Sequence, residues 1–512
     1  MMTATETPSA HLGALEKLPT TSILGYGLGD FAMNLSFAMS TSFLLYYFTD
    51  VGGLSAAAVG TMFLVVRLWD AFTDLFAGRV VDKTMTRWGK FRPFLLWFAV
   101  PVLFLSFLNF NIPTQGVKWL GIFEVNPDAT AQLLYAYLAY AILGLLYSLI
   151  NIPYGALASA MTQSVNERAK LVAARAFGAA IGGVLLTYIV APQISAIQKT
   201  APKLAANADA AAKAAYQTAV LAYRQNVQSV FTLTTLLFVL VGSIAFFLTF
   251  WWCRESVVRT SPKVTIKETV ETLKQNKPLA YLCAASLFYL VGLFAVGGST
   301  AFYAKYVLGD ISQTANMVLV NSGIALLITP IIPWIIRKMG KKNVFQWCGL
   351  FTIIGGVALF FVPTGAVAMA LIFLAVKGIG ASLINTVMFG LEADTVEYGE
   401  WKSGKRSEGA TYAIFSFTRK VTQSIGGAMG AWLLAIGGYL SATATDPNPT
   451  QPESAIVAIK FTIGLLPAIC AVIAMLIFWK YPLTDKLFQQ IRDENEAKKA
   501  KLGADFHGAA TD

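Results

Sequence analysis

Val230–Trp252 reads VFTLTTLLFVLVGSIAFFLTFWW and contains no charged residue. A helix needs about 20 apolar residues to cross the hydrocarbon core of a bilayer, so this run is long enough to span a membrane. The composition agrees, because charged residues make up 13% and hydrophobic residues 56% of the 512 residues, with a mean hydropathy of +0.60. Soluble domains carry about 25% charged residues. The sequence therefore predicts a protein with many membrane-spanning helices.

Further runs of this kind follow one another along the chain. Phe461–Trp479 is uncharged, and Val344–Val376 is an uncharged run too long for one crossing, which a turn at Pro363–Gly365 divides into two. We therefore expect an all-α membrane protein with twelve transmembrane helices in two six-helix pseudo-repeats. Their expected positions are residues 22–48, 54–78, 93–112, 130–152, 171–193, 227–252, 279–304, 314–336, 344–362, 366–391, 411–439 and 455–480.

Lysine and arginine are concentrated in every second loop between these helices. Loops 79–92, 254–277 and 337–342 hold many of them, whereas the alternate loops hold few. Because basic loops stay in the cytoplasm, we expect both termini there and the Ala-rich stretch 201–222 outside, as an extension of the flanking helices. The net charge of +11 is interpreted as this topology signal and not as a nucleic-acid-binding surface.

Two short motifs recur in the two halves of the chain. Ser148–Asn151 reads SLIN, as does Ser382–Asn385, and Arg175 and Arg419 each stand six residues before an Ile-Gly-Gly triplet. Such repeats are typical of transporters with a central site between two halves. The expected parts are a cytoplasmic N-terminal tail, a first bundle, a cytoplasmic linker, a second bundle and a cytoplasmic C-terminal tail, at residues 1–21, 22–252, 253–278, 279–480 and 481–512.

Ionisable residues at membrane depth are costly and indicate function. Arg67, Asp70 and Asp74 lie three and four residues apart, which places them on one helical face, where the two carboxylates can hold a small cation or share a proton. A structural ion pair with Arg67 is the alternative, and it leaves one carboxylate unexplained. Asp30 and Asn34 repeat the four-residue spacing, after glycines interpreted as a close helix contact.

Four cations also lie within the expected spans, and a second charged cluster lies between the expected tenth and eleventh helices. The buried cations are Arg175, Lys377, Arg419 and Lys420, of which Lys377 is equally well explained as structural. The charged cluster is predicted either to be solvated or to form a cytoplasmic gate that closes one transport state. The residues of that gate are Arg168, Asp394, Glu397, Glu400 and Arg406.

Several motifs carry a family resemblance. Gly78–Lys83 followed by Arg87–Lys90 resembles the loop signature of the major facilitator superfamily, and Arg337–Lys342 lies at the matching place in the second half. Within that superfamily the chain resembles the glycoside-pentoside-hexuronide:cation symporters, which include the melibiose permease. The runs that carry this resemblance are GYGLG at 25–29, YYFTD at 46–50, RLWDAFTD at 67–74, RWGKFRP at 87–93, NIPY at 151–154 and DTVEYGEW at 394–401.

This resemblance implies sugar uptake coupled to sodium or proton influx, with site residues in both halves. Asp70 and Asp74 would hold the coupling cation, which is a metal ion if the chain is sodium-coupled, together with Thr73 and Ser148. Thr73 stands where the melibiose permease has Asn, which puts sodium selectivity in question. The residues implied in substrate binding are Asp30, Asn34, Asn151, Tyr154, Arg175, Asn385 and Lys420.

The departures from the melibiose permease bear on the substrate. Asn34 and Asn151 replace two sugar-binding carboxylates and Gly155 replaces a stacking tryptophan, so a galactoside site of that kind is not intact. Asparagine still donates and accepts hydrogen bonds, which favours another neutral saccharide or glycoside, with a hexuronide as the second choice. A lysolipid carrier and a sugar sensor that does not transport are the alternative functions.

The remaining expectations concern chemistry, assembly and location. Both histidines, His11 and His507, lie in polar tails, and the four cysteines show no ligand spacing. No nucleophile–base pair or metal motif appears, so an enzyme is not expected, and neither is a cofactor beyond the coupling ion. We expect a monomer in the bacterial inner membrane whose partners are the sugar or glycoside, the coupling cation and membrane lipid.

Overall fold

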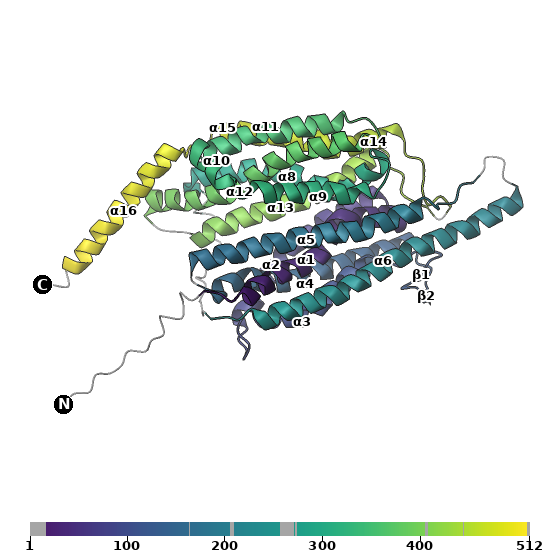
Figure 1. Cartoon of the computed structure of the whole chain (residues 1–512), viewed down its shortest axis with the longest axis horizontal. Coiled ribbons are helices and arrows are strands. Elements are labelled where there is room, and N and C mark those ends of the chain that lie inside the picture. The colour runs from purple at the N-terminus through teal and green to yellow at the C-terminus, as the bar shows by residue number, and fades with distance from the viewer. Residues whose placement is uncertain are drawn as a thin grey trace. The chain divides into compact units, whose positions relative to one another are not determined.

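The computed structural model describes residues 17–162, 164–204, 209–256, 271, 274–404, 408–443 and 445–508. These residues are almost all helical (Figure 1). The first part of the chain forms α1 (Thr20–Tyr46), η2 (Tyr47–Val51), α2 (Ala56–Lys83), α3 (Arg92–Asn109), β1 (Lys118–Trp119), β2 (Phe123–Glu124), α4 (Ala129–Met161), α5 (Val165–Gln198) and α6 (Ala210–Trp252). The second part forms α8 (Lys277–Tyr306), α9 (Gln313–Ile328), α10 (Ile332–Met339), α11 (Lys341–Phe360), α12 (Val367–Ser403), α13 (Glu408–Ile436), α14 (Glu453–Lys460), η3 (Phe461–Leu465), α15 (Leu466–Trp479) and α16 (Asp485–Gly508).

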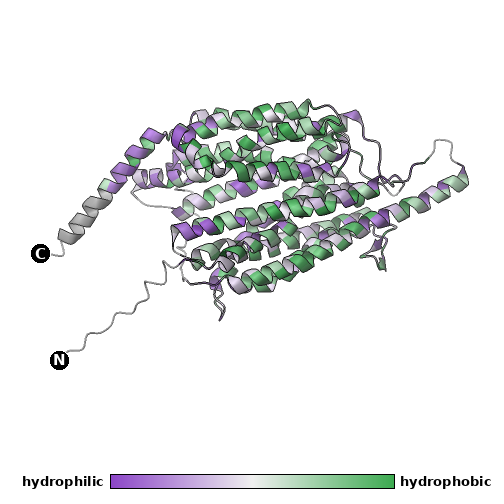
Figure 2. Ribbon diagram, in the orientation of Figure 1, coloured by the Kyte–Doolittle hydropathy of each residue, from purple (hydrophilic) through white to green (hydrophobic). Residues whose placement is uncertain are grey.

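A helix or a broken helix stands at each of the twelve expected positions. Within the described residues, nine helices are long and apolar enough to cross a membrane, or ten if α9 and α10, bent by 59°, form one broken span. Pro330 and Pro333 flank this bend, and proline removes a backbone donor and disrupts a helix. Figure 2 shows how apolar residues dominate the long helices, while the described part of α16 is hydrophilic.

Several elements differ from the predicted ranges. α4, α6 and α12 are longer than expected, and α6 begins at Ala210, within the Ala-rich stretch. The loop after α3 forms a short antiparallel sheet in which Lys118 pairs with Glu124, and the C-terminal tail contains α16. Most of the expected linker, 253–278, lies outside the described residues.

The chain divides into two compact units. The first comprises Met1–Gly53, Trp69–Ser261 and Ala442–Pro447, and the second comprises Leu54–Leu68, Pro262–Ser441 and Asn448–Asp512. The boundary passes through α2 between Leu68 and Trp69, so the start of this helix groups with the second unit and its remainder with the first.

Glycines allow one pair of helices in each unit to pack backbone to backbone. In the first unit, a Cβ atom at Gly178 of α5 would collide with the carbonyl of Gly27 in α1, and one at Gly182 would lie 2.9 Å from the Phe31 carbonyl oxygen. In the second unit, a Cβ atom at Gly426 of α13 would lie 2.8 Å from the Val291 carbonyl oxygen of α8. Only glycine permits such an approach, so the two halves share one mode of helix contact.

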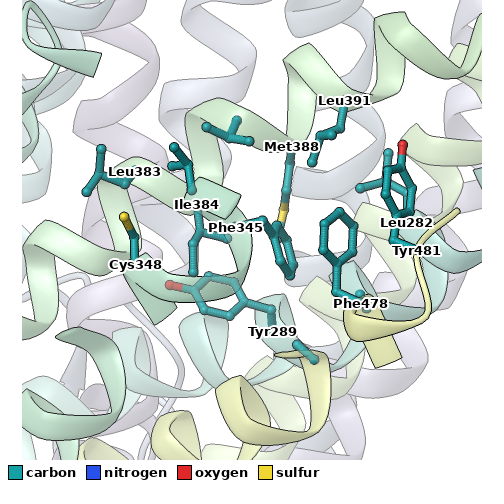
Figure 3. Close-up of a cluster of buried hydrophobic side chains, with 14 of the residues drawn as sticks. Leu282, Tyr289, Phe345, Cys348, Leu383, Ile384, Met388, Leu391, Phe478 and Tyr481 are labelled. Carbon is teal, nitrogen blue, oxygen red and sulfur yellow. The ribbon is translucent and has the colours of Figure 1, made fainter. Parts of the chain in front are cut away.

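The second unit has an aromatic core at the ends of α8, α11, α12 and α15 (Figure 3). The rings of Phe345 and Phe478 lie 4.0 Å apart, and Tyr481 stacks on Phe478 at 4.3 Å. Ile491 of α16 belongs to the same cluster and is 1% exposed. The first turns of α16 are therefore fixed by apolar burial on this core.

Candidate functional site

The predicted cation-binding residues of α2 lie on one face of that helix. Asp70 and Asp74 are half-buried, and Thr73 between them is buried, with its hydroxyl donating to the carbonyl of Asp70 at 3.0 Å. Residues four apart on a helix are neighbours about one turn apart. The two carboxylates therefore lie close together along the helix.

α4 supplies the surface that this face of α2 meets. A Cβ atom at Gly144 would collide with the Asp70 carboxylate, so the absence of a side chain at Gly144 makes room for that group. Ser148 lies one turn further along α4, is buried, and donates its hydroxyl to the Gly144 carbonyl at 3.1 Å. Ala77 and Leu149 belong to one apolar cluster, which extends the same α2–α4 contact. The structure thus brings Asp70 to Gly144, one helical turn from Ser148.

Asp30, Tyr154 and Arg175 form a second cluster in the first unit. Arg175 Nε lies 3.2 Å from Asp30 Oδ1, and its guanidinium lies 5.1 Å from the centre of the Tyr154 ring. Tyr154 stacks on Tyr26 at 4.7 Å, and each hydroxyl donates to the backbone carbonyl of the other residue. Gly29 is required here, because a Cβ atom there would collide with the Tyr154 ring. Three predicted substrate-binding residues therefore meet on a rigid aromatic support.

Both predicted amide ligands of the first unit are half-buried. Asn34 Nδ2 donates to the carbonyl of Asp30 at 2.9 Å, within α1, and its oxygen accepts no hydrogen bond from the described residues. Asn151 lies on α4 three residues before Tyr154. Both amides retain hydrogen-bonding capacity for hydroxyl groups.

The second unit places two of its predicted residues beside an aromatic ring. Arg419 Nη1 donates to Asn385 Oδ1 at 3.2 Å, and the guanidinium lies 4.8 Å from the centre of the Phe389 ring, which is 43% exposed. Lys420 follows on α13 and is half-buried. The sequence analysis did not identify Phe389, although the repeat contains the signal: counting from the matched SLIN motifs, Phe389 corresponds to Gly155.

Lys377 has a structural role. Its ammonium is buried and donates to the Ile463 carbonyl at 2.8 Å. That carbonyl lies four residues before Pro467, which has no N–H to donate to it. The lysine therefore supplies the donor that the helix lacks at η3, and the structural interpretation of Lys377 accounts for its burial.

The described residues of the predicted cytoplasmic gate form several separate contacts. Asp394 pairs with Lys341 Nζ at 2.6 Å, and the carbonyl of Glu397 accepts from Asn495 of α16 at 3.1 Å. Arg168 Nε donates to the Thr162 carbonyl at 3.0 Å. Glu400 is half-buried on α12, and Arg406 lies outside the described residues. The Asp394–Lys341 pair was not anticipated.

Comparisons with known proteins agree on one family. The family model described as MFS/sugar transport protein matches residues 25–485. The glucuronide carrier protein homolog of Escherichia coli K12 is 40% identical over 94% of this chain and 97% of its own. The isoprimeverose transporter of Lactiplantibacillus pentosus is 30% identical over 95% of this chain and 93% of its own. A crystal structure of a D-xylose–proton symporter matches with a TM-score of 0.53 at 16% identity, covering 91% of this chain and 98% of that one, which shows a shared fold.

Gly144→Ala is predicted to weaken cation binding while the protein stays folded. The added methyl group would displace the Asp70 carboxylate, and overpacking of this kind costs about 1–3 kcal/mol. A cost of that size borne by the cation-bound geometry corresponds to roughly 5- to 150-fold in affinity. Gly155→Ala on the same helix is the control, because its Cβ atom would meet only Arg175 Nη1 at 3.9 Å. Sodium binding by calorimetry and proton uptake by titration provide the measurement. Equal binding by both variants would mean that Asp70 does not bind the cation beside Gly144.

Proposed function

Because the chain belongs to the MFS/sugar transport protein family, we propose that it is a secondary active symporter that couples the uptake of a sugar or glycoside to the influx of sodium or protons. Members of this family move solutes across membranes and are not enzymes. The observation that carries the proposal of coupling is the α2 carboxylate pair, Asp70 and Asp74, of which Asp70 packs against Gly144 of α4, one helical turn from Ser148. Two carboxylates in such a place favour a bound cation or a shared proton.

The substrate that we favour carries a negative charge, as a glucuronide does. Within the described residues, Arg419 forms no ion pair, and its partners are the neutral groups of Asn385 and Phe389. A guanidinium at membrane depth without a carboxylate partner favours an anionic ligand, which it can bind through two parallel hydrogen bonds. The name of the 40% identical relative supports the same class of substrate.

Each unit would then have its own part in binding. In the first, Asp30, Asn34 and Asn151 supply hydrogen-bonding groups for sugar hydroxyls, the buried Tyr154 supports them, and Arg175 holds Asp30 in place. In the second, Asn385, Arg419 and Lys420 supply the amide and the cations. We propose that cation and substrate binding are reciprocally coupled, typically by about 1–3 kcal/mol, and that transport proceeds by alternating access.

Asp74→Asn is predicted to abolish the cation dependence of substrate affinity and of accumulation against a gradient. Replacing the carboxylate with an amide removes the charge that attracts the cation but keeps its shape. The measurement is binding of a labelled glucuronide across a sodium series at fixed pH, and across a pH series without sodium. The control is Asp30→Asn, which should alter substrate affinity more than cation response. A wild-type cation response of Asp74→Asn in both series would contradict the assignment.

Lys420→Ala is predicted to abolish uptake of a glucuronide while the protein still inserts into the membrane. The reason is that the half-buried ammonium offers a charge for the substrate carboxylate. The exposed Lys338 of α10 provides the matched control, and Lys338→Ala should transport normally. Uptake into vesicles of a glucuronide, the matching neutral glucoside and a lysolipid is compared for all three proteins. Preferential uptake of the neutral glucoside by wild type would refute the anionic substrate, and uptake of the lysolipid alone would refute the sugar.

For the membrane orientation, we propose that both termini lie in the cytoplasm of a bacterial cell, with the protein in the inner membrane. The distribution of basic loops supports this orientation. A cysteine introduced at the exposed Ala210, at the start of α6, should react with a membrane-impermeant reagent added outside. Labelling from the cytoplasmic side alone would reverse the proposed orientation.

A further inference from the structure

A pocket of about 410 Å³ lies in the first unit, where α1 begins and where α4 and α6 end. Its volume falls within the range of ligand-binding sites, roughly 300–1,000 Å³. The pocket lies at the end of the unit that also holds the basic loop before α3, because Glu255 accepts the backbone N–H groups of Lys90, Phe91 and Arg92. No role in sugar or cation binding has been assigned to it.

The charged side chains that line this pocket are both cations, Lys17 and Arg254. Within the described residues neither of them forms an ion pair. Two carboxylates lie nearby: Glu255 holds the loop before α3, and Glu167 pairs with Lys170 at 2.7 Å and accepts the N–H of Leu18, which itself lines the pocket, at 3.2 Å. The side chains that line the pocket therefore carry two positive charges and no negative one.

Hydroxyl groups on the pocket wall complete a set suited to an oxyanion. Thr162 is 3% exposed, and its hydroxyl oxygen accepts from the Ser164 N–H at 3.1 Å, which leaves the hydroxyl proton to be donated. Thr21 presents a second hydroxyl from the exposed side of α1. A phosphate group accepts hydrogen bonds from hydroxyls and from both kinds of cation.

An apolar stripe on α6 runs toward the same pocket. The large side chains of this stripe lie three or four residues apart on a helix that can span the membrane. Between 46% and 68% of each side chain is not covered by protein. This spacing keeps them on one helical face. Figure 2 shows α6 coloured as hydrophobic through this region. The stripe consists of Leu233, Leu237, Leu240, Ile244, Phe247 and Trp251, and Trp251 also lines the pocket.

The apolar stripe favours a phosphate group that belongs to a lipid over a soluble phosphate. Exposed apolar residues on a membrane-spanning helix contact acyl chains, and tryptophan is enriched at the level of the lipid headgroups. A lipid whose chains lie along the α6 stripe would have its headgroup at Trp251, beside Lys17 and Arg254. Basic pockets at the cytoplasmic ends of helices suit anionic headgroups. We propose that this pocket binds the headgroup of an anionic phospholipid of the inner leaflet.

The experiment measures lipid binding to the full-length protein in detergent by native mass spectrometry. Phosphatidylglycerol is the anionic probe, phosphatidylcholine the neutral one, and inorganic phosphate the soluble source of the same group. Wild type should retain phosphatidylglycerol in preference to phosphatidylcholine, and 10-fold excess inorganic phosphate should not displace it. The double variant Lys17→Gln/Arg254→Gln should bind phosphatidylglycerol about 30-fold more weakly, since each of the two basic side chains adds to the attraction.

The matched control removes two cations of the same unit that do not line the pocket. Lys118→Gln/Lys213→Gln changes exposed residues of β1 and of the start of α6, and should bind phosphatidylglycerol as wild type does. Equal retention of the two lipids by wild type, equal loss in both double variants, or displacement by inorganic phosphate would each overturn the proposal.

A second measurement does not depend on removing charge. In Thr21→Cys, with both cations intact, phosphatidylglycerol should slow labelling of the new thiol by a polar reagent, and phosphatidylcholine should not. Labelling at the same rate with either lipid would overturn the proposal even if the charge variants failed to fold.

Discussion

A polar group at membrane depth has no water to bind, so it must find its partner inside the protein. Lys377 illustrates the constraint, because Pro467 leaves the Ile463 carbonyl without its helical donor and the buried ammonium replaces it. Tyr26 and Tyr154 satisfy each other's backbone carbonyls in the same way. These contacts fix the helices at the points where they deviate from regular geometry or carry charge, and the candidate site is built between such points.

The two units share the same glycine contact between helices but differ in the polar side chains beside it. Gly182 and Gly426 each admit the backbone of a neighbouring helix, α1 at the Phe31 carbonyl and α8 at the Val291 carbonyl. When these contacts are matched, Asn34 corresponds to Phe294, since each presents its Cβ atom to the same glycine.

By the same matching, the position of Asp30 in the first unit corresponds to that of a leucine, Leu290, in the second. The second unit therefore lacks a carboxylate where the first has one. It has instead an exposed ring, Phe389, where the first has Gly155. The repeat preserves the helix contact, and each unit has its own side chains for chemistry.

Much of this could be predicted from the sequence, because the bilayer imposes a length and an apolar composition on each span. The division at Pro363–Gly365 and the glycine contacts follow from local chemistry, as does the helical face shared by Asp70 and Asp74. α1 and α13 are not among the helices apolar enough to count as spans by hydropathy, and they carry Asp30 and Lys420. α2 counts as a span although it carries Arg67, Asp70 and Asp74, so the charged residues alone do not explain this difference.

Contacts between distant segments could not be predicted in this way. The Lys341–Asp394 pair joins residues 53 positions apart, and Asn495 reaches the Glu397 carbonyl from the C-terminal helix. No periodicity or spacing links such residues, because the link exists only after the helices have packed. The pocket beside Trp251 is of the same kind, since three helix ends meet there.

The sequence favoured a neutral sugar, and the arrangement of charge favours an anionic one. Arg175 is balanced by Asp30, so its presence alone does not call for an anion. Arg419 has only neutral partners within the described residues, and the cost of holding that charge at membrane depth falls when a carboxylate binds.

The charge of the substrate also determines which driving force acts on transport. One cation carried with a neutral sugar moves a net charge across the membrane, and the membrane potential drives that movement by about 2.3 kcal/mol per 100 mV. One cation carried with a uronide moves no net charge, so the cation gradient alone would have to drive accumulation.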